Sequence, residues 1–234
     1  MRVPARLVRI RQETPTVKSF LFDLGDAPFS FLPGQWVDLY IDIGASLIVG
    51  GFSIVSSPLQ RGTIRLAIKK LPWGEASVYL HDHAKVGDSF LLEGGSGDFY
   101  YQKSMADTLI LIAGGIGITP IMSIIRYVDE ACPEVEATLI YSATAPSETV
   151  FLSALSEISA RNPKVKCVFT MTGPGAEFWN GRVGRIDLPM LREHLPAKPA
   201  LWYVCGPSGM IKDVEEMLGR VGVDPSRVKA ERWW

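Results

Sequence analysis

The pattern of apolar and polar residues changes character before the midpoint of the chain. In the first hundred residues, short stretches alternate between apolar and polar side chains, and turn sequences such as DLGDAP at 23–28 separate them. This alternation is typical of strands with one buried face. We expect strands at 6–10, 17–22, 35–41, 51–55, 63–69 and 88–92, and one short helix at 74–81. These residues therefore predict a small antiparallel β-barrel or sandwich.

Beyond a polar stretch at 100–107 (YYQKSMAD), strand-like and helix-like segments alternate. We expect strands at 108–113, 137–142, 165–171, 200–205 and 228–231, and helices at 120–130, 148–160, 189–194 and 209–220. Such alternation predicts a parallel sheet covered by helices. The chain is therefore expected to contain an antiparallel β-barrel over 1–104 and an α/β parallel-sheet nucleotide-binding domain over 105–234.

The second domain opens with the most informative stretch, TLILIAGGIGITPIMSIIRY at 108–127. An apolar strand runs into a glycine turn, and a helical pattern follows, for which Thr119 suits the N-cap and Pro120 the first position. Glycines allow close approach of a ligand, and a helix N-terminus attracts anions, so the turn predicts a pyrophosphate site. A packing role remains an alternative for this turn alone. The expected contacts are Gly114, Gly115, Gly117, Thr119 and Pro120.

A second glycine turn follows the expected strand at 200–205 and reads CGPSGM. In a doubly wound sheet, ligands bind outside the carboxyl ends of the strands, so the two turns can face one crevice. This pairing favours the ligand-binding interpretation for both turns. The expected contacts here are Cys205, Gly206, Pro207, Gly209 and Met210.

Composition narrows the class of protein. The 234 residues are 47% hydrophobic and carry a formal net charge of −1, with no basic face for nucleic acid. No stretch reaches the roughly 18 apolar residues of a membrane helix, and the first residues lack the pattern of a secretion signal. The three cysteines form no CxxC pair and no metal-ligand cluster. We therefore expect a cytoplasmic protein without a metal site, a membrane span or a nucleic-acid partner.

In order along the chain, these motifs resemble those of the ferredoxin–NADP⁺ reductase superfamily, whose members join a flavin-binding β-barrel to a pyridine-nucleotide domain. The resemblance covers nearly the whole chain. The two nucleotide-domain motifs match closely, as GGIGITP at 114–120 and CGPSGM at 205–210. Segments resembling the flavin-domain motifs are PGQ at 33–35, GFS at 51–53, IK at 68–69, GEAS at 74–77 and GSGDF at 95–99.

The resemblance implies how the barrel would bind a flavin. Phe52 would stack on the isoalloxazine ring, and Ser53 would place a hydroxyl near the flavin N5 atom. Lys69 and the helix that begins near Ala76 would approach the ribityl and phosphate groups. The implied flavin contacts are Phe52, Ser53, Ile68, Lys69, Gly74, Ala76 and Ser77.

The resemblance also implies three catalytic residues, Ser53, Cys205 and Glu231. Cys205 and Glu231 would border the space where nicotinamide C4 meets flavin N5. Without the resemblance, Cys205 would be interpreted as a buried packing residue, because unpaired cysteines are commonly buried. At the end of the chain, Trp233 or Trp234 would shield the flavin until the nicotinamide displaces it.

The flavin signature departs from the family pattern. Where the family has Arg-x-Tyr-Ser, this chain has GGFS at 50–53, so Gly50 replaces the arginine that pairs with the flavin phosphate. Substitute cations could come from Arg61, Arg65, Lys69 or Lys70. FAD is the expected flavin, with FMN as an alternative.

The choice of nicotinamide cofactor depends on the segment after the second strand of the α/β domain, SATAP at 142–146. It has no basic pair for a 2′-phosphate and no acidic residue for a free 2′-hydroxyl. Arg182 and Arg185 are the nearest basic residues in the sequence. The absence of a basic pair favours NAD(H) over NADP(H).

The sequence therefore predicts a flavin-dependent NAD(P)H oxidoreductase that passes hydride from nicotinamide C4 to flavin N5. The cysteines cannot form a four-thiolate cluster, so we expect the electron acceptor to be a separate protein or a small molecule. An alternative is a flavin-free NAD(H)-binding sensor or assembly module, which Gly50 keeps open. The sequence does not indicate an oligomeric state.

Overall fold

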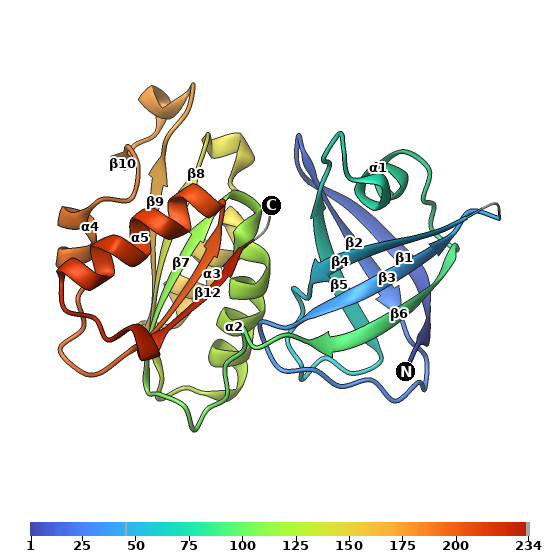
Figure 1. Cartoon of the computed structure of the whole chain (residues 1–234), viewed down its shortest axis with the longest axis horizontal. Helices are drawn as coiled ribbons and strands as arrows, with labels where there is room; N and C mark the ends of the chain where they lie inside the picture. The colour runs from blue at the N-terminus through green and yellow to red at the C-terminus, as the bar shows by residue number, and fades with distance from the viewer. Residues whose placement is uncertain (45, 233–234) are drawn as a thin grey trace.

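The computed structural model describes residues 1–44 and 46–232, which form two domains lying side by side (Figure 1). The first domain is built on a six-stranded antiparallel sheet with the strand order β4-β3-β6-β1-β2-β5. Its elements are β1 (Val3–Thr14), β2 (Val17–Asp23), β3 (Trp36–Asp42), β4 (Leu47–Ser53), β5 (Thr63–Lys69), α1 (Glu75–Asp82) and β6 (Ser89–Ser96).

The sheet curls into a barrel that is closed at one end and open at the other. Its edge strands, β4 and β5, meet at an antiparallel bridge between Ile54 and Leu66. The barrel interior is filled by alternate residues of the strands, for example Leu39 and Ile41, which are fully buried. At the open end, α1 packs against β4. The unpaired backbone edges of the two strands are available there to a ligand.

The second domain is built on a six-stranded parallel sheet with the order β10-β9-β8-β7-β11-β12. Its elements are β7 (Thr108–Gly114), α2 (Ile118–Ala131), β8 (Glu136–Ala143), α3 (Leu152–Arg161), β9 (Val165–Met171), β10 (Arg182–Val183), α4 (Leu188–Glu193), β11 (Leu201–Gly206), α5 (Ser208–Arg220) and β12 (Val228–Arg232). Short 3₁₀ turns are found at Gly115–Gly117, Pro146–Glu148, Ala176–Phe178 and Pro225–Arg227. The predicted fold class, an antiparallel barrel followed by a parallel α/β domain, is confirmed.

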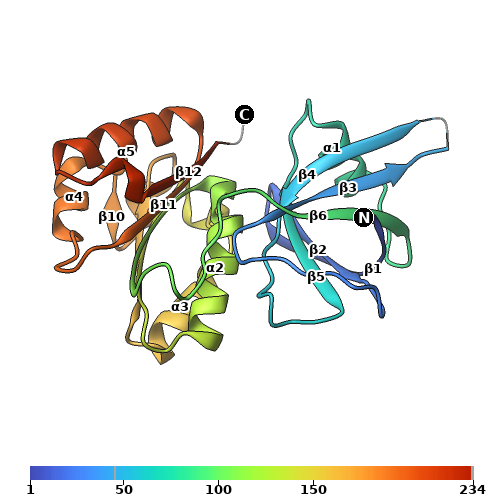
Figure 2. The ribbon, with the colours of Figure 1, turned by 60° about the horizontal axis from the view of Figure 1, so that its bottom comes forward.

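Helices cover both faces of the parallel sheet (Figure 2). Alternate residues of β7 divide between the two layers: Leu111 packs in a cluster with α2 and α3, and Ile112 in a cluster with α4 and α5. From β7 the chain proceeds to β8 and β9 on one side, then crosses back to β11 on the other. The carboxyl ends of β7 and β11 therefore form the switch point at which sheets of this kind bind ligands.

Helix α2 lies between the parallel sheet and the barrel (Figures 1 and 2). Its Ser123 hydroxyl donates to the carbonyl of Ser56 at 2.8 Å, and its Arg126 guanidinium donates to the carbonyl of Val55 at 3.0 Å. Burial lowers the pKa of Arg126 to about 10. Farther along the interface, the Thr16 hydroxyl donates to the Glu148 carboxylate at 2.6 Å. These bonds fix the orientation of the two domains beside the site.

Several predicted boundaries were wrong, each for a local reason. Helix α2 begins at Ile118 after Gly117, and the Thr119 hydroxyl donates back to the carbonyl of Ile116 at 2.9 Å, so Thr119 is not the N-cap. Helix α3 begins at Leu152 and not near 148, because Phe151 takes a left-handed conformation with a φ of 62°. The two-residue strand β10 was not predicted, since it is too short to show a pattern.

Candidate functional site

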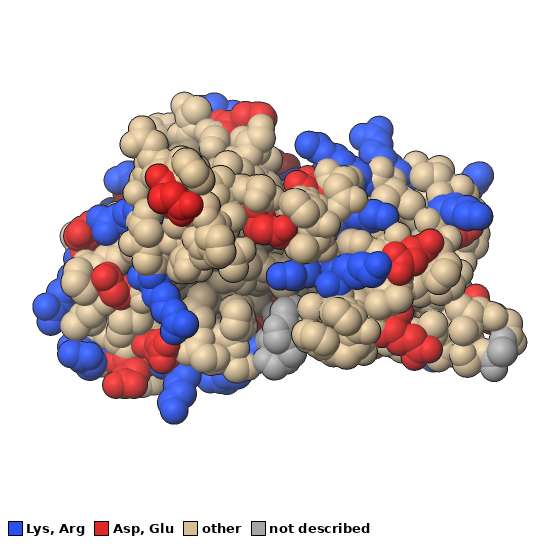
Figure 3. Space-filling model, turned by 90° about the horizontal axis from the view of Figure 1, so that it is seen from above, with Lys and Arg blue, Asp and Glu red and all other residues tan. Residues whose placement is uncertain are grey.

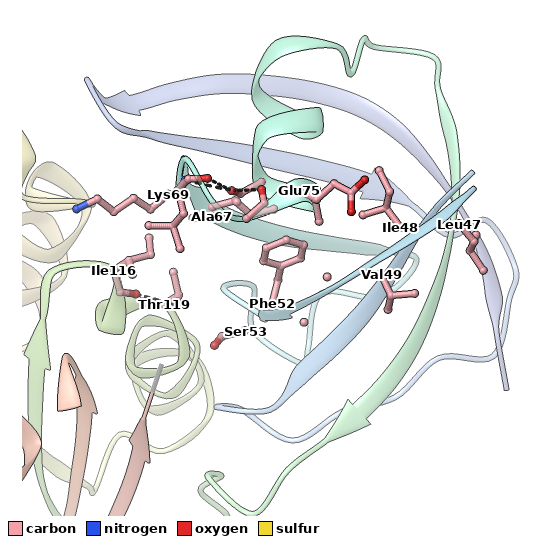
Figure 4. Close-up of a pocket in the computed structure, with 17 residues that line it drawn as sticks. Leu47, Ile48, Val49, Phe52, Ser53, Ala67, Lys69, Glu75, Ile116 and Thr119 are labelled. Atoms are coloured by element: carbon pink, nitrogen blue, oxygen red, sulfur yellow. Dashed lines mark hydrogen bonds between the residues drawn. The ribbon is translucent and has the colours of Figure 1, made fainter. Parts of the chain in front are cut away.

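A cavity of about 360 Å³ occupies the open end of the barrel, and we call it the barrel cavity (Figure 4). It lies between the two edge strands, beneath the N-terminus of α1, and reaches α2 at its inner end. Its lining residues are Leu47, Ile48, Val49, Gly50, Gly51, Phe52, Ser53, Ala67, Ile68, Lys69, Leu71, Gly74, Glu75, Ala76, Ser77, Ile116 and Thr119.

One wall of the barrel cavity is formed by residues with little or no side chain, among them Gly50, Gly51, Gly74 and Ala76. A β-carbon at Gly50 would lie 2.6 Å from the Phe52 ring and 2.7 Å from the β-carbon of Ala76. The phenyl ring therefore lies over Gly50, where a larger residue would collide with it. An arginine at position 50 would not fit this arrangement, so Gly50 and Phe52 form a matched pair.

The N-terminus of α1 faces the same cavity. The first N–H groups of a helix have no partner within it and carry partial positive charge, so Glu75, Ala76 and Ser77 present donors suited to a phosphate. The Ser77 hydroxyl is engaged in the preceding turn, 2.8 Å from the carbonyl of Gly74, and it accepts from the N–H of Leu71 at 3.1 Å. Any phosphate contact from Ser77 would therefore come from its backbone.

Ser53 and Thr119 lie at the inner end of the barrel cavity, where the two domains meet (Figure 4). Ser53 is 5% exposed, so little of the residue reaches bulk solvent. A flat ring lying between Phe52 and Ser53 would have donors and acceptors available from the unpaired strand edges. Together with the glycine-lined wall and the helix N-terminus, these features fit a flavin.

Lys69 is the last residue of β5, and it contributes to the walls of two cavities. Figure 4 shows its side chain extending away from Phe52 and Glu75, toward the second domain. Lys69 lines the barrel cavity, and its approach to the flavin ribityl and phosphate groups stays a prediction. Among the described residues, Arg61, Arg65 and Lys70 do not line the barrel cavity, and Lys70 forms an ion pair with Asp82 at 2.7 Å.

A second cavity, of about 420 Å³, lies outside the carboxyl ends of the parallel strands, and we call it the sheet cavity. It shares Lys69 and Ile116 with the barrel cavity. Its lining residues are Thr16, Val17, Lys69, Gly114, Gly115, Ile116, Ser142, Ala143, Thr144, Glu148, Val150, Thr172, Arg185, Ile186, Pro207, Gly209, Met210, Asp213 and Val214. The prediction that both glycine turns face one crevice is consistent with this geometry.

The glycines of the two turns have two roles: some leave room for a ligand, and others allow the turns to pack closely. Gly115 has a φ of 53° and Gly209 lies in α5, and a β-carbon at either would meet open space, so both leave room for a ligand. A β-carbon at Gly114 would instead lie 2.5 Å from the sulfur of Met210, and one at Gly206 would lie 3.1 Å from the α-carbon of Gly114. These two glycines, like Gly117, allow the turns to pack against each other.

Two of the predicted catalytic residues are neighbours at the end of the sheet. Cys205 on β11 pairs in register with Glu231 on β12 and with Ala113 on β7. Cys205 is fully buried. In the described part of the chain, Cys205, Glu231, Gly117, Pro120 and Gly206 do not line either cavity. Trp233, the last predicted cofactor contact, lies outside the described residues.

Sequence reasoning missed several residues that line the barrel cavity, among them Glu75, Leu47 and Val49. Glu75 follows Gly74 within a segment already assigned to the flavin, so its acidic character was a signal that could have been used. The contribution of Leu47 and Val49 depends on how far the open seam extends along β4, which a strand pattern does not reveal. Glu148 lines the sheet cavity, and its carboxylate accepts a hydrogen bond from Thr16 of the barrel, a contact between the domains that the sequence does not reveal.

Residues 1–44 and 46–232 contain no group of three His, Cys, Asp or Glu side chains that could hold a metal ion. None of their helices combines the length and apolar character needed to cross a membrane. On the face shown in Figure 3, acidic and basic side chains are intermingled.

Comparison with protein families matches both domains. Residues 4–101 match the model of the oxidoreductase FAD-binding domain, and residues 111–216 match that of the oxidoreductase NAD-binding domain. The structure is similar to the FAD/NAD-binding domain of nitric oxide dioxygenase from Vibrio cholerae, with a TM-score of 0.88, 24% identity and coverage of 99% of this chain and 98% of that one. A ferredoxin–NADP⁺ reductase from Neisseria gonorrhoeae gives a TM-score of 0.83 at 20% identity, covering 100% and 99%. At these identities the two structures support the fold alone.

Two curated relatives align along nearly all of the chain. The glycine betaine monooxygenase reductase subunit of Chromohalobacter salexigens is 31% identical over 231 residues, which cover 97% of this chain and 62% of that protein. The chain thus spans about three fifths of that relative's length. Oxidoreductase NAD-binding domain-containing protein 1 of Pongo abelii is 33% identical over 251 residues, covering 98% and 79%. With a barrel that matches the oxidoreductase FAD-binding domain and an α/β domain that matches the oxidoreductase NAD-binding domain, the chain belongs to the ferredoxin–NADP⁺ reductase-like family.

Proposed function

We propose that this protein oxidises NADH at the junction of its two cavities and delivers the electrons to a separate acceptor. The observation that carries the proposal is the shared wall: Lys69 and Ile116 line both the barrel cavity and the sheet cavity. When bound, a flavin accepts hydride from the nicotinamide and passes electrons onward. The protein contributes alignment, because two ligands held in adjoining cavities react as if at very high local concentration.

In this proposal, the barrel holds the flavin by shape and backbone donors. The Phe52 ring would pack on one face of the isoalloxazine, and the Ser53 hydroxyl, buried at the inner end of the barrel cavity, would form a hydrogen bond near the reacting edge. The N–H groups at the start of α1 would bind the phosphate beside the ribityl chain. Thr119 and Ile116, which extend from the second domain, exclude water from the inner end.

The sheet cavity would hold the nicotinamide nucleotide. Gly115 and Gly209 permit close approach of its pyrophosphate, and Lys69 reaches this cavity from the barrel. We assign Cys205 and Glu231 to the nicotinamide end, supported by their pairing at the carboxyl ends of β11 and β12. There Cys205, which is fully buried, would lie behind the surface that meets the ring, and the Glu231 carboxylate would accept a hydrogen bond.

Charge in the sheet cavity supports NADH over NADPH. A 2′-phosphate requires a surplus of positive charge, but Arg185 shares the cavity with Asp213 and Glu148. The other candidate, Arg182, forms an ion pair with Glu193. The segment after β8 contributes the neutral residues Ser142, Ala143 and Thr144. The expected result is a kcat/KM for NADH at least tenfold higher than for NADPH, which steady-state assays with an artificial acceptor would measure.

The remaining parts of the proposal concern the acceptor and the setting. Relatives named as reductase subunits of a monooxygenase support an acceptor that is another protein component. We propose a cytoplasmic setting and a domain boundary between residues 104 and 105, in the segment between β6 and β7.

The spectrum of the purified protein tests the proposal. Flavin absorbance that bleaches on adding NADH under anaerobic conditions is the expected result. A protein that takes up neither FAD nor FMN, yet still binds NADH, would contradict it and support a flavin-free NAD(H)-binding sensor. The glycine at position 50 is the reason to test this second function, because no arginine is present there to anchor the flavin phosphate.

A further inference from the structure

We propose that Tyr141 is a positioning residue, which holds the glycine turn after β7 in the conformation that binds the pyrophosphate of NADH. The inference rests on the proposed function, because it requires NADH in the sheet cavity. Tyr141 lies on β8, beside β7, and its side chain is fully buried. It is not among the described residues that line either cavity, so it would act through the turn and not by touching the nucleotide.

The Tyr141 hydroxyl joins two segments of the wall of the sheet cavity. It donates to the carbonyl of Gly115 at 3.0 Å and accepts from the N–H of Val150 at 3.2 Å. Both Gly115 and Val150 line the sheet cavity. Because a carbonyl only accepts and an N–H only donates, these two partners determine the direction of the hydroxyl proton. Burial raises the pKa of Tyr141 above its usual value, so the hydroxyl remains a donor at neutral pH.

The hydrogen bond from Tyr141 fixes the orientation of the peptide unit that joins Gly115 to Ile116. In a trans peptide the C=O and the N–H point in opposite directions. Since the Gly115 carbonyl points at the buried hydroxyl, the N–H of Ile116 points away from the core cluster that contains Tyr141. Ile116 lines both cavities, so this donor lies where the two cavities adjoin.

The glycine turn needs such a restraint because glycine itself supplies none. Gly115 has a φ of 53°, and glycine adopts positive and negative φ about equally well. Its carbonyl also accepts from the N–H of Ile118, but that bond lies within the 3₁₀ turn and does not tie the turn to the sheet. The bond from Tyr141 does.

A restrained turn binds an anion more tightly than a mobile one. Successive backbone N–H groups in a turn of this kind form a concave site for phosphate. When the turn is already held in the binding conformation, less conformational entropy is lost on binding. Tyr141 therefore contributes to the affinity for the pyrophosphate and not to the hydride-transfer step.

The test compares Tyr141→Phe with the wild-type protein, because phenylalanine fills the same space and lacks only the hydroxyl. Calorimetric titrations use NAD⁺, ADP-ribose and adenosine, none of which reduces a flavin. The Kd for NAD⁺ and for ADP-ribose should rise about tenfold through the loss of a buried hydrogen bond. The Kd for adenosine, which carries no phosphate, should change by less than about twofold. In assays with an artificial acceptor, the KM for NADH should rise while kcat stays the same.

Tyr101→Phe and Tyr203→Phe are the matched controls, because both tyrosines are also fully buried. The Tyr101 hydroxyl donates to the carbonyl of Ala106 at 2.8 Å. The Tyr203 hydroxyl donates to the carbonyl of Tyr100, also at 2.8 Å. Neither acceptor belongs to a described residue that lines a cavity. All three variants should lose similar amounts of thermal stability, but only Tyr141→Phe should bind ADP-ribose more weakly.

Amide NMR spectra of the wild-type protein give a second measurement that needs no variant. The amide proton of Ile116 should move downfield on adding ADP-ribose, as a hydrogen bond to phosphate requires, and should not do so on adding adenosine. An unmoved Ile116 amide, or an unchanged Kd for ADP-ribose in Tyr141→Phe, would overturn the inference and leave the proposed function standing. Equal weakening of ADP-ribose and adenosine would also overturn it. If the wild-type protein binds neither NAD⁺ nor ADP-ribose, the proposed function itself fails.

Discussion

A β-carbon at Gly117 would collide with the carbonyl oxygen of Cys205. This contact joins the glycine turn after β7 to the turn after β11, the two segments that the sequence marks as cofactor-binding. Part of what reads as a ligand-binding motif is therefore a packing device that brings two strand ends together. The remaining glycines of the turns, Gly115 and Gly209, are those with open space beside them.

This division predicts opposite outcomes for two alanine substitutions. Gly117→Ala should lower the free energy of unfolding by about 1–3 kcal/mol, because the new methyl group meets backbone that cannot move aside easily. Gly209→Ala should be neutral or stabilising by up to about 1 kcal/mol, since it lies in a helix with open space around it. It should nevertheless raise the Kd for NADH several-fold, because the methyl group intrudes on the sheet cavity. Urea unfolding and NADH titration measure the two effects, and a destabilised Gly209→Ala variant with normal NADH affinity would contradict the assignment.

Cys205→Ala tests the proposed catalytic role of the thiol. If Cys205 borders the nicotinamide ring, removing its sulfur should slow single-turnover flavin reduction by NADH about tenfold, equivalent to about 1.4 kcal/mol in the barrier. Cys132→Ala is the matched control, because Cys132 is also fully buried but follows the far end of α2. Both variants lose a similar amount of packing. Equal reduction rates in the two variants would assign Cys205 to packing.

The sequence was a good guide where local chemistry decides structure. The alternation of β5 and the apolar run of β7 predicted those strands closely, and both glycine turns were found at the ends of parallel strands. It was a poor guide where distant residues meet. The direction of Lys69 depends on the interface between the domains, and the crowding at Gly50 depends on Ala76 of α1, whose β-carbon lies against it. Neither fact is contained in a spacing or a composition.

The pairing of Gly50 with Phe52 predicts a non-additive effect. Gly50→Ala should destabilise the protein by about 1–3 kcal/mol, because the new methyl group overlaps the phenyl ring and the β-carbon of Ala76. In a Phe52→Ala background the same change should be less destabilising by at least about 0.5 kcal/mol, since the ring is gone. Denaturant unfolding of the four proteins measures the coupling. The same loss in both backgrounds would show that the ring does not constrain position 50.

The pH dependence of stability should reveal how α1 is held against β5. His81, in the last turn of α1, donates from Nε2 to the carbonyl of Ile68 at 2.8 Å, and Ile68 lines the barrel cavity. Burial lowers the pKa of His81 and outweighs the hydrogen bond to Ile68, which raises it; the positive charges of Lys18 and Lys70 lower it further, while Asp82 raises it. The unfolded state then binds more protons than the folded state below the usual histidine pKa of about 6.5, so stability falls as the pH drops through that value.

His81→Gln keeps an N–H donor for Ile68 but cannot be protonated in this range. Its melting temperature should therefore fall less between pH 7.5 and 5.5 than that of the wild type, whereas a change at the exposed His83 should leave the wild-type dependence intact. His194, whose pKa burial also lowers, is present in every variant and contributes equally to each. An identical acid loss in His81→Gln and wild type would show that another group controls the stability of this region.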